Sequence, residues 1–428
     1  MLLYGVAALL TPVVVLLVVA MVNNRTSELN IPTHTVPADS ALPALHQVSL
    51  LGKRMAHQSP YSMPLRSGQQ LTVADYANCA NDATETMAAL HSALKLPFVE
   101  HATRSVKDTI PEFAEMRETA RILSGVADHY EIVGDYGRAM ELRLDGLEFG
   151  VKIPRQGGIL PQLVGGAVHA IAAVRIEDLV PHLPPDQLKS AAAHLDAIEA
   201  AETSYSDIVL EEGYTSTSYL KEIFKGFRLT PKGVDELHDT FGSGAMGDMS
   251  TMGKLRETGK MTKIVLASKR GLLEANLEYC RSVSKEVSGP YKKSLASQMP
   301  ISLGAMGWGD SFHTAWEKQL SMQAVRRVLK TEIALELYFK TNGKYPQSLG
   351  QLVPVYLKSV PSDPFSPTMG PLIYRLQNNH FVVYSIGPDM QDNAGTSAKY
   401  AGTMPGDIVS GYLAGAKKRP PLPTAPKQ

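Results

Sequence analysis

The carboxylate pair Glu211-Glu212 is the feature of this sequence best suited to acid–base chemistry. It lies in a predicted helix directly before Gly213 and could supply a general acid and a general base. His169, in an apolar stretch with helical periodicity, could complete a cleft with the pair. Two interpretations stay open. Either these side chains form the centre of a hydrolase, or the pair lies on a solvated helix face and His169 packs in a core.

No catalytic motif accompanies that pair. The sequence contains no H-E-x-x-H, no G-x-S-x-G and no Walker A motif. Gly242, Gly244 and Gly247 spell G-x-G-x-x-G, but no strand is expected before them and no clear helix after them. The stretch 226–260, rich in Gly and Met, is therefore predicted to be a flexible surface loop, and the sequence discloses no reaction.

Composition limits the classes of protein that fit. The chain has 428 residues, 44% apolar and 20% charged, which suits two or three folded domains. Lys plus Arg and Asp plus Glu each number 42, and this net charge of zero argues against a nucleic-acid partner. Two cysteines are too few for a disulfide scaffold or a four-thiolate zinc site. Cys79 and Cys280 fall in predicted helices, and a single bridge and two unpaired buried thiols both stay open.

The N-terminus predicts a membrane anchor over residues 1–22. The run 2–22 carries no charge and is long enough to cross a hydrocarbon core of about 30 Å as a helix. A cleaved signal peptide is the alternative, since Val18-x-Ala20 loosely resembles a cleavage site. That reading lacks a basic leader, and the apolar run is longer than usual. We therefore expect an uncleaved anchor whose partner through residues 2–22 is the lipid bilayer.

The pattern changes after the anchor. Residues 23–71 are rich in Pro and Ser and predict a linker with one short helix near Leu45 to Met55. Residues 72–310 then carry helical periodicity and predict an α-helical domain. The tail 417–428, rich in Pro, is expected to be disordered.

Within the helical domain the periodicity predicts a helical hairpin. Apolar residues recur every three or four positions on both sides of Gly134-Asp135, at Met116, Ala120, Leu123, Ala127 and Tyr130 and then at Ala139, Leu142, Gly146 and Phe149. A third helix follows Pro161. The charges of Arg175 and Glu177 exclude that helix as a second membrane span.

The C-terminal stretch 311–416 predicts a separate folding unit. An amphipathic helix runs from Trp316 to Lys340 and stops before Gly343, a residue that readily adopts a left-handed turn. The stretches 372–376 and 380–386 predict a β-hairpin, and 407–409 could add a third strand. The whole chain is therefore expected to be α+β: an N-terminal transmembrane helix, a mostly α-helical middle domain and a small helix-plus-antiparallel-sheet domain.

Five pieces of this C-terminal domain resemble a known family. LELYFKTNGKYPQSLGQLV, VPSDPF, PLIYRL, FVVYSIGPDMQDNAG and GDIV follow one another in the order and spacing of the globular half of the type II secretion major pseudopilin. The helical stretch from about Met116 to Phe224 also resembles uncharacterised membrane-anchored bacterial proteins that often end in this module. The chain lacks the basic leader of pseudopilins and their glutamate near the start of the apolar stretch.

The resemblance implies a location and a metal. It places the body on the extracytoplasmic side of the inner membrane in a single-pass protein, although Arg25, Lys53 and Arg54 after the anchor would favour the opposite orientation. The matching pseudopilin loop binds calcium. Asp389 and Asp392 fall in that loop and Asp407 opens the last strand, so the resemblance implies a calcium site at these three residues, with hard oxygen ligands.

Two functions follow as expectations. The first is a membrane-anchored extracytoplasmic scaffold or binding protein with a protein partner, near a secretion or pilus-like system. The alternative is a membrane-anchored hydrolase with a cleft in the helical domain around His169 and Glu211. A convergent, buried pair of a histidine and a carboxylate would favour the hydrolase.

Overall fold

The computed structural model describes residues 29–58, 71–99, 101–105, 107–108, 113–226, 269–299, 311–377, 380–396, 406–409 and 422–424. The predicted anchor 2–22, nearly all of the predicted loop 226–260 and most of the tail 417–428 lie outside these residues.

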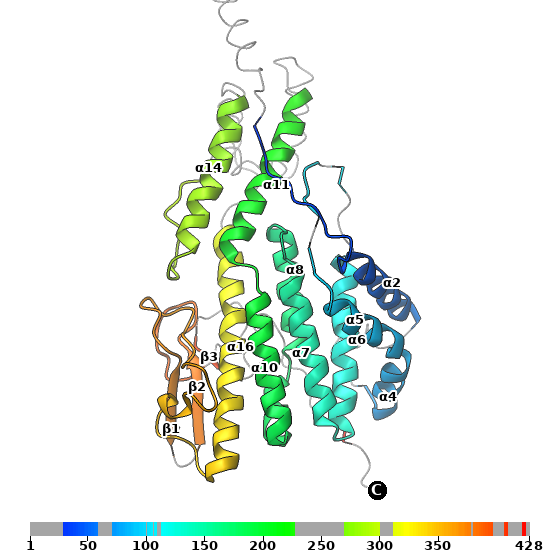
Figure 1. Ribbon diagram of the computed structural model, residues 1–428, viewed down its shortest axis with the longest axis vertical. Helices are drawn as coiled ribbons and strands as arrows, with labels where there is room; N and C mark the ends of the chain where they lie inside the picture. The colour runs from blue at the N-terminus through cyan, green and yellow to red at the C-terminus, as the bar shows by residue number, and fades with distance from the viewer. Residues whose placement is uncertain are drawn as a thin grey trace, which may run out of the picture.

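The described part is mostly helical, with one small antiparallel sheet, which confirms the α+β class (Figure 1). Its helices are α2 (Leu42–Gln58), α4 (Val73–Asp82), α5 (Thr84–Leu94), α6 (Phe113–Ile132), α7 (Tyr136–Lys152), α8 (Ile159–Ala172), α9 (Ile176–Leu179), α10 (Pro185–Ala201), α11 (Tyr205–Gly226), α14 (Lys269–Val287) and α16 (Ser311–Asn342). Two short 3-10 helices are η1 (Val180–His182) and η2 (Leu349–Leu352). The strands are β1 (Ile373–Gln377), β2 (His380–Ser385) and β3 (Ile408–Val409).

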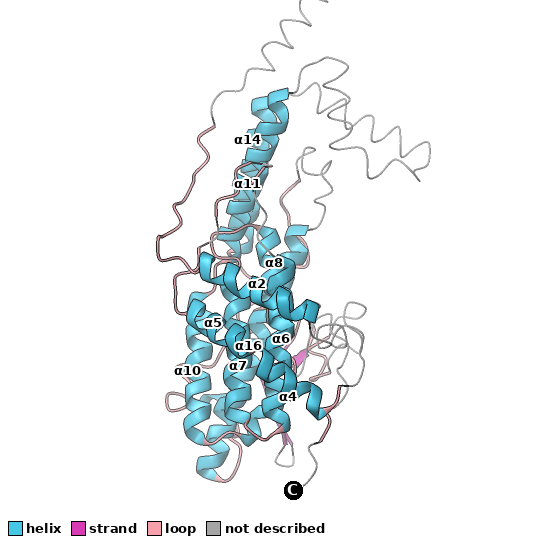
Figure 2. Cartoon of the chain, turned by 90° about the vertical axis from the view of Figure 1, so that its right-hand side faces the viewer, coloured by secondary structure: helices cyan, strands magenta, loops and turns pink. Residues whose placement is uncertain are grey.

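The helices form an elongated bundle. In Figure 1, α6, α7, α8, α10 and α16 run side by side, and the pair α11 and α14 extends beyond them at one end. Figure 2 shows α2, α4 and α5 covering the outer face of α6 and α7. The sheet lies on the opposite side of the molecule, against α16.

The predicted helical hairpin is confirmed as α6 and α7. Gly134 adopts the left-handed conformation with φ +81°, which a glycine tolerates without strain. Asp135 then caps α7 by accepting a hydrogen bond from the Arg138 backbone N–H at 3.2 Å. Leu123, Leu144 and Leu147 are fully buried and hold the two helices in the core.

The helix α8 is a core helix of this bundle. Among the described residues, Ile159–His182 is the one stretch long and apolar enough to cross a membrane. Yet α8 ends at Ala172, and Arg175 adopts a left-handed conformation before α9 starts. Val168 and Ala172 are fully buried against neighbouring helices. Packing inside the protein therefore accounts for one apolar face of α8, while Leu160 and Leu163 on it are exposed.

The helix expected within the linker 23–71 is longer than predicted and contributes to the core. It spans Leu42–Gln58 as α2, and Ala41, Leu45 and Val48 are buried in one cluster with Leu94 and residues of α6, α7 and α8. This part of the chain is thus attached to the bundle. Its Pro- and Ser-rich surroundings concealed an apolar face.

The helix α16 joins the bundle to the sheet. It confirms the predicted amphipathic helix and its stop at Gly343, whose φ is +70°. One face packs Leu329, Ile333 and Leu337 into the core of α7 and α10. Another face packs Val328 and Leu335 against residues of η2 and β2, so the stretch 311–416 shares its main helix with the helical domain.

The small sheet has the order β1-β2-β3 and is antiparallel throughout. In the predicted hairpin, Tyr374 pairs with Val383, and Ser385 pairs with Ile408 on the third strand.

The two cysteines are free and buried, Cys79 on α4 and Cys280 on α14, which settles the open alternative against a bridge. Burial raises the pKa of both thiols to about 12.

Candidate functional site

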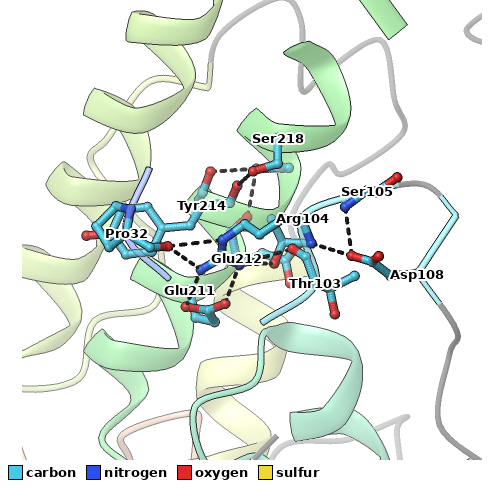
Figure 3. A network of polar contacts seen from close by, with 12 residues as sticks. Pro32, Thr103, Arg104, Ser105, Asp108, Glu211, Glu212, Tyr214 and Ser218 are labelled. Atoms are coloured by element: carbon cyan, nitrogen blue, oxygen red, sulfur yellow. Dashed lines mark hydrogen bonds and ion pairs between the residues drawn. The ribbon is translucent and has the colours of Figure 1, made fainter. Parts of the chain in front are cut away.

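The carboxylate pair Glu211-Glu212 lies on α11 at the centre of a polar network (Figure 3). Arg104, from the segment 101–105, meets Glu211 with both arms of its guanidinium. Nη1 lies 2.6 Å from Oε1 and Nη2 lies 3.2 Å from Oε2. The two side chains are 17% and 13% exposed, so Glu211 forms a half-buried two-point ion pair and does not lie on a solvated face.

Arg104 also binds the chain's described N-terminal segment. Its Nε and Nη2 donate to the Pro32 carbonyl at 3.1 and 2.8 Å, and Nη1 donates to the Thr103 carbonyl at 3.0 Å. The guanidinium carbon lies 5.7 Å from the centre of the Tyr214 ring. One side chain thus joins three segments that are far apart in sequence, and we call this arrangement of Arg104, Glu211 and Pro32 the Arg104 clasp.

A tight turn holds Arg104 in place. Asp108 Oδ2 accepts hydrogen bonds from the backbone N–H groups of Arg104 and Ser105 at 2.6 and 2.8 Å. Ser105 Oγ donates to Glu222 Oε2 at 2.7 Å, further along α11. Asp108 thus closes the turn, and Ser105 fixes it to α11 independently of the contacts that the Arg104 side chain makes.

Glu212 caps a different helix. It is deeply buried, and its Oε2 accepts a hydrogen bond of 2.7 Å from the backbone N–H of Ile159, the first residue of α8. Burial raises the pKa of Glu212 to about 7; the Ile159 N–H opposes the rise and the charge of Glu211 adds to it. Gly158 leaves room for the carboxylate, since a Cβ there would lie 2.3 Å from Oε2.

A polar seam continues from Glu212 between α11 and α14. Ser216 Oγ donates to the Glu212 carbonyl at 2.7 Å, and Asn276 Nδ2 donates to Ser216 Oγ and Thr217 Oγ1 at 2.9 and 2.8 Å. Figure 3 also shows Ser218, whose Oγ donates to the Tyr214 carbonyl at 2.8 Å. The Ser216 and Ser218 hydroxyl groups bond to carbonyl groups of α11 itself, and the two bonds from Asn276 join α14 to α11.

The structure keeps His169 apart from this network. His169 is 2% exposed on α8, and burial, together with the nearby charge of Arg326, lowers its pKa well below the ordinary value. Within the described residues, no hydrogen bond or ion pair joins His169 to Glu211, which Arg104 occupies instead. The arrangement at Glu211-Glu212 is that of a structural clasp and a helix cap.

The three predicted calcium ligands lie around one loop, and protein groups occupy each of them. Asp389 Oδ1 accepts from the Gln391 N–H at 3.0 Å. Asp392 accepts from the Tyr384 hydroxyl at 2.8 Å and pairs with Arg375 at 2.7 Å.

The third of these ligands, Asp407, is fully buried. It accepts from the backbone N–H groups of Gly395 and Asn393 at 2.7 and 3.2 Å. Burial raises the pKa of Asp407, and the charges of Asp392 and Asp389 add to the rise, as expected of neighbouring carboxylates. Protein groups thus satisfy all three carboxylates, and calcium binding stays a prediction.

Asp363, directly before Pro364, forms a turn. Its Oδ1 accepts from the Phe365 N–H at 2.9 Å, two residues ahead, which is an Asx-turn. Oδ1 also accepts from Ser385 Oγ at 2.6 Å, and Oδ2 accepts from the Ile386 N–H at 2.8 Å. The buried carboxylate thereby fixes the turn to the end of β2.

One further group of titratable side chains was not predicted from the sequence. Asp145, Glu148 and His194 are the described triad of His, Cys, Asp or Glu whose ligand atoms all lie within 4.8 Å of one another. The spacing of Asp145 and Glu148 on one helix was a signal, but nothing local indicated His194, which lies on α10. Arg104 was missed for the same reason, because it lies 107 positions from Glu211.

Comparisons with known proteins leave the function open. No family model matches the chain, and neither a curated protein nor a solved structure matches it.

Proposed function

We propose that this protein is a membrane-anchored extracytoplasmic scaffold or binding protein of the inner membrane. Residues 2–22 would be its anchor, and the pseudopilin-like end at 311–416 would associate it with a secretion or pilus-like system and a protein partner there. The observation that carries the proposal is the Arg104 clasp, which binds the stretch shortly after the proposed anchor to the body of the protein.

A rigid attachment suits a scaffold. The Pro32 carbonyl accepts two hydrogen bonds from Arg104, which Glu211 holds in turn by two more. Charge-assisted bonds of this kind are about twice as strong as neutral ones, so the stretch around Pro32 is fixed to α11. The helix α16 packs against both the bundle and the sheet and adds stiffness at the other side.

A membrane-anchored hydrolase remains the second candidate, and one observation favours it. Glu212 has a pKa of about 7, a value at which a carboxyl group exchanges protons near neutral pH. Its engagement with Ile159 and its deep burial favour the capping role. A hydrolase acting through Glu212 would lose turnover in Glu212→Gln while remaining folded, whereas a scaffold would keep its binding.

Location and partner can be tested in native membranes. We expect the protein to stay in the membrane fraction after carbonate extraction, and protease added to spheroplasts to digest the body. Crosslinking in these membranes, followed by mass spectrometry, should identify a protein partner in the wild type and much less of it in Arg104→Ala. Arg270→Ala, which removes an exposed arginine paired with Glu274 on α14, is the matched control. Protection of the body in spheroplasts would overturn the orientation, and equal capture by both variants would overturn the role of the clasp.

A further inference from the structure

Four titratable side chains from three helices meet on the side of the bundle where α5, α7 and α10 approach one another. Asp145 and Glu148 lie one turn apart on the same face of α7. His194 comes from α10 and His91 from α5. All four belong to well-packed helices, and α7 is anchored beneath them by Leu144 and Leu147, which are fully buried.

The nitrogen and oxygen atoms that could bind a metal already lie close together. His194 Nε2 lies 2.8 Å from Glu148 Oε2, and His91 Nδ1 lies 3.1 Å from Asp145 Oδ2. The ligand atoms of Asp145, Glu148 and His194 all lie within 4.8 Å of one another. Ligand atoms around a tetrahedral zinc ion, at about 2.0–2.1 Å from the metal, lie roughly 3.3 Å apart, so these three atoms would need to move only slightly closer together. His91 lies outside this close group and would have to turn toward it to become the fourth ligand.

The electrostatics of the group favour an added cation. The carboxylates of Asp145 and Glu148 are only 12% and 19% exposed and lie on the same face of α7. Two half-buried carboxylates one turn apart repel each other, and a divalent ion between them would relieve that repulsion.

Lys152 orients the group from its edge. It contacts Glu148 Oε1 and the Leu94 carbonyl at the end of α5. This contact occupies the oxygen that faces away from His194 and leaves Oε2 on the side of the imidazole. Partners of this kind fix the direction of a metal ligand and are part of most protein metal sites.

We propose that Asp145, Glu148, His194 and His91 form a binding site for a divalent transition-metal ion of the zinc class. Imidazole nitrogens and carboxylate oxygens are both ligands of tetrahedral Zn²⁺, whereas Ca²⁺ and Mg²⁺ prefer sites built wholly from oxygen. His91, with a side chain 58% exposed, is the ligand free to adjust and the route by which the ion enters. The site ties α5, α7 and α10 together and is separate from the predicted calcium loop.

The test uses the untagged full-length protein in detergent, stripped with EDTA and dialysed. ZnCl2 alone is titrated by calorimetry, and CoCl2 alone serves as a spectroscopic probe of coordination. We expect one zinc per chain, an intense visible spectrum typical of tetrahedral cobalt, and a higher melting temperature with zinc. His194→Gln and Glu148→Gln should each weaken zinc binding at least tenfold, since loss of even an outer partner costs about 10–100-fold.

Two matched controls use exposed residues of the same types. Glu141→Gln, on α7 four residues before Asp145, and His380→Ala, on β2, should leave zinc affinity unchanged.

Wild-type protein is also modified with diethyl pyrocarbonate, and zinc should protect His91 and His194 but not His380; this readout needs no variant to fold. Absence of one-to-one binding, an octahedral cobalt spectrum, or protection that misses His91 and His194 would overturn the site.

Discussion

Glu212 of α11 accepts a hydrogen bond of 2.7 Å from the backbone N–H of Ile159, the first residue of α8. A carboxylate from one helix therefore caps another helix 53 positions away in sequence. The first N–H groups of a helix have no partner within it, and a negative charge there is favourable. The contact also places a carboxyl group where burial raises its pKa to about 7.

The first prediction concerns stability against pH. Because the pKa of Glu212 rises from 4.5 to about 7 on folding, the folded protein binds this proton more tightly than the unfolded chain does. The resulting stability is complete below pH 4.5 and is lost as the pH rises through 7, by about 3 kcal/mol at 1.36 kcal/mol per unit. Glu212→Gln keeps an acceptor for Ile159 and removes the titration. Thermal melts should therefore find it near wild type at pH 4.5 and more stable at pH 8. A variant with the same pH dependence as the wild type would contradict this assignment, and Glu141→Gln, at an exposed site on α7, is the control.

The second prediction concerns the Arg104 clasp. Arg104→Ala removes a half-buried two-point ion pair and the two bonds to the Pro32 carbonyl, and we expect a loss of about 2–3 kcal/mol in the free energy of unfolding. Amide hydrogen exchange should speed up around residues 29–40 and 101–105. Arg270→Ala breaks an exposed pair with Glu274 and should cost less than about 1 kcal/mol. Equal losses in the two variants would mean that the clasp adds nothing beyond a surface ion pair.

The third prediction compares two glycines beside α8. In Gly158→Ala the new Cβ would lie 2.3 Å from Glu212 Oε2 and must displace the cap, so we expect a loss of about 1–3 kcal/mol. In Gly166→Ala the nearest atom is Met322 Sδ at 3.5 Å, an ordinary contact. Within a helix this second change should be neutral or stabilising by up to about 1 kcal/mol. Urea unfolding measures the free energy of unfolding of both variants. The prediction is wrong if Gly158→Ala is as stable as Gly166→Ala or more stable.

The fourth prediction concerns calcium at Asp389, Asp392 and Asp407. Millimolar calcium should raise the melting temperature by a few degrees, and Asp392→Ala should abolish most of that rise. Arg375 pairs with Asp392 at 2.7 Å and competes with a cation for it, so Arg375→Ala should tighten calcium binding. Asp363→Ala should weaken the turn before β1 yet leave the calcium response. If magnesium acts as well as calcium, or neither acts, the loop holds no calcium site.

The fifth prediction concerns the stretch 311–416 expressed alone. Leu329, Ile333 and Leu337 pack into the core of α7 and α10, and the isolated piece would expose them. The sequence predicts a separate folding unit here, but the packing of α16 in both cores argues against it. We therefore expect the isolated piece to bind a hydrophobic dye and to unfold without a sharp transition, whereas the full chain should show one that includes α16. A sharp calorimetric transition of the isolated piece would show that η2 and the sheet suffice to stabilise it.

Local signals explain what the sequence could predict. The stop at Gly343, the turn at Gly134-Asp135 and the hairpin of β1 and β2 each depend on residues close in the chain, and all three are confirmed. The buried role of α2 was missed because its apolar partners lie on α5 and α6.

Contacts between positions far apart in the chain could not be predicted from the sequence. Glu148 and His194 are 46 positions apart, and Arg104 and Glu211 are 107 apart, so no spacing rule joins them. The partners of Glu211 and Glu212 were likewise not predictable, because they come from distant segments of the chain. Their neighbourhood in sequence predicted a shared acid–base role, but the fold gives one residue an arginine and the other a helix N-terminus.

The central place of α16 also sets an order of events during synthesis. The helices from α2 to α14 leave the ribosome before it, yet Leu329 and Ile333 fill the core of α7 and α10, and Trp316 fills that of α11 and α14. Until α16 emerges, those helices keep apolar surface open to solvent. Contacts between distant parts of a chain form slowly, and such intermediates aggregate readily. The core of the bundle is therefore completed late in synthesis. A chain released by a ribosome that stalls before residue 311 would expose apolar surface, aggregate readily and depend on chaperones.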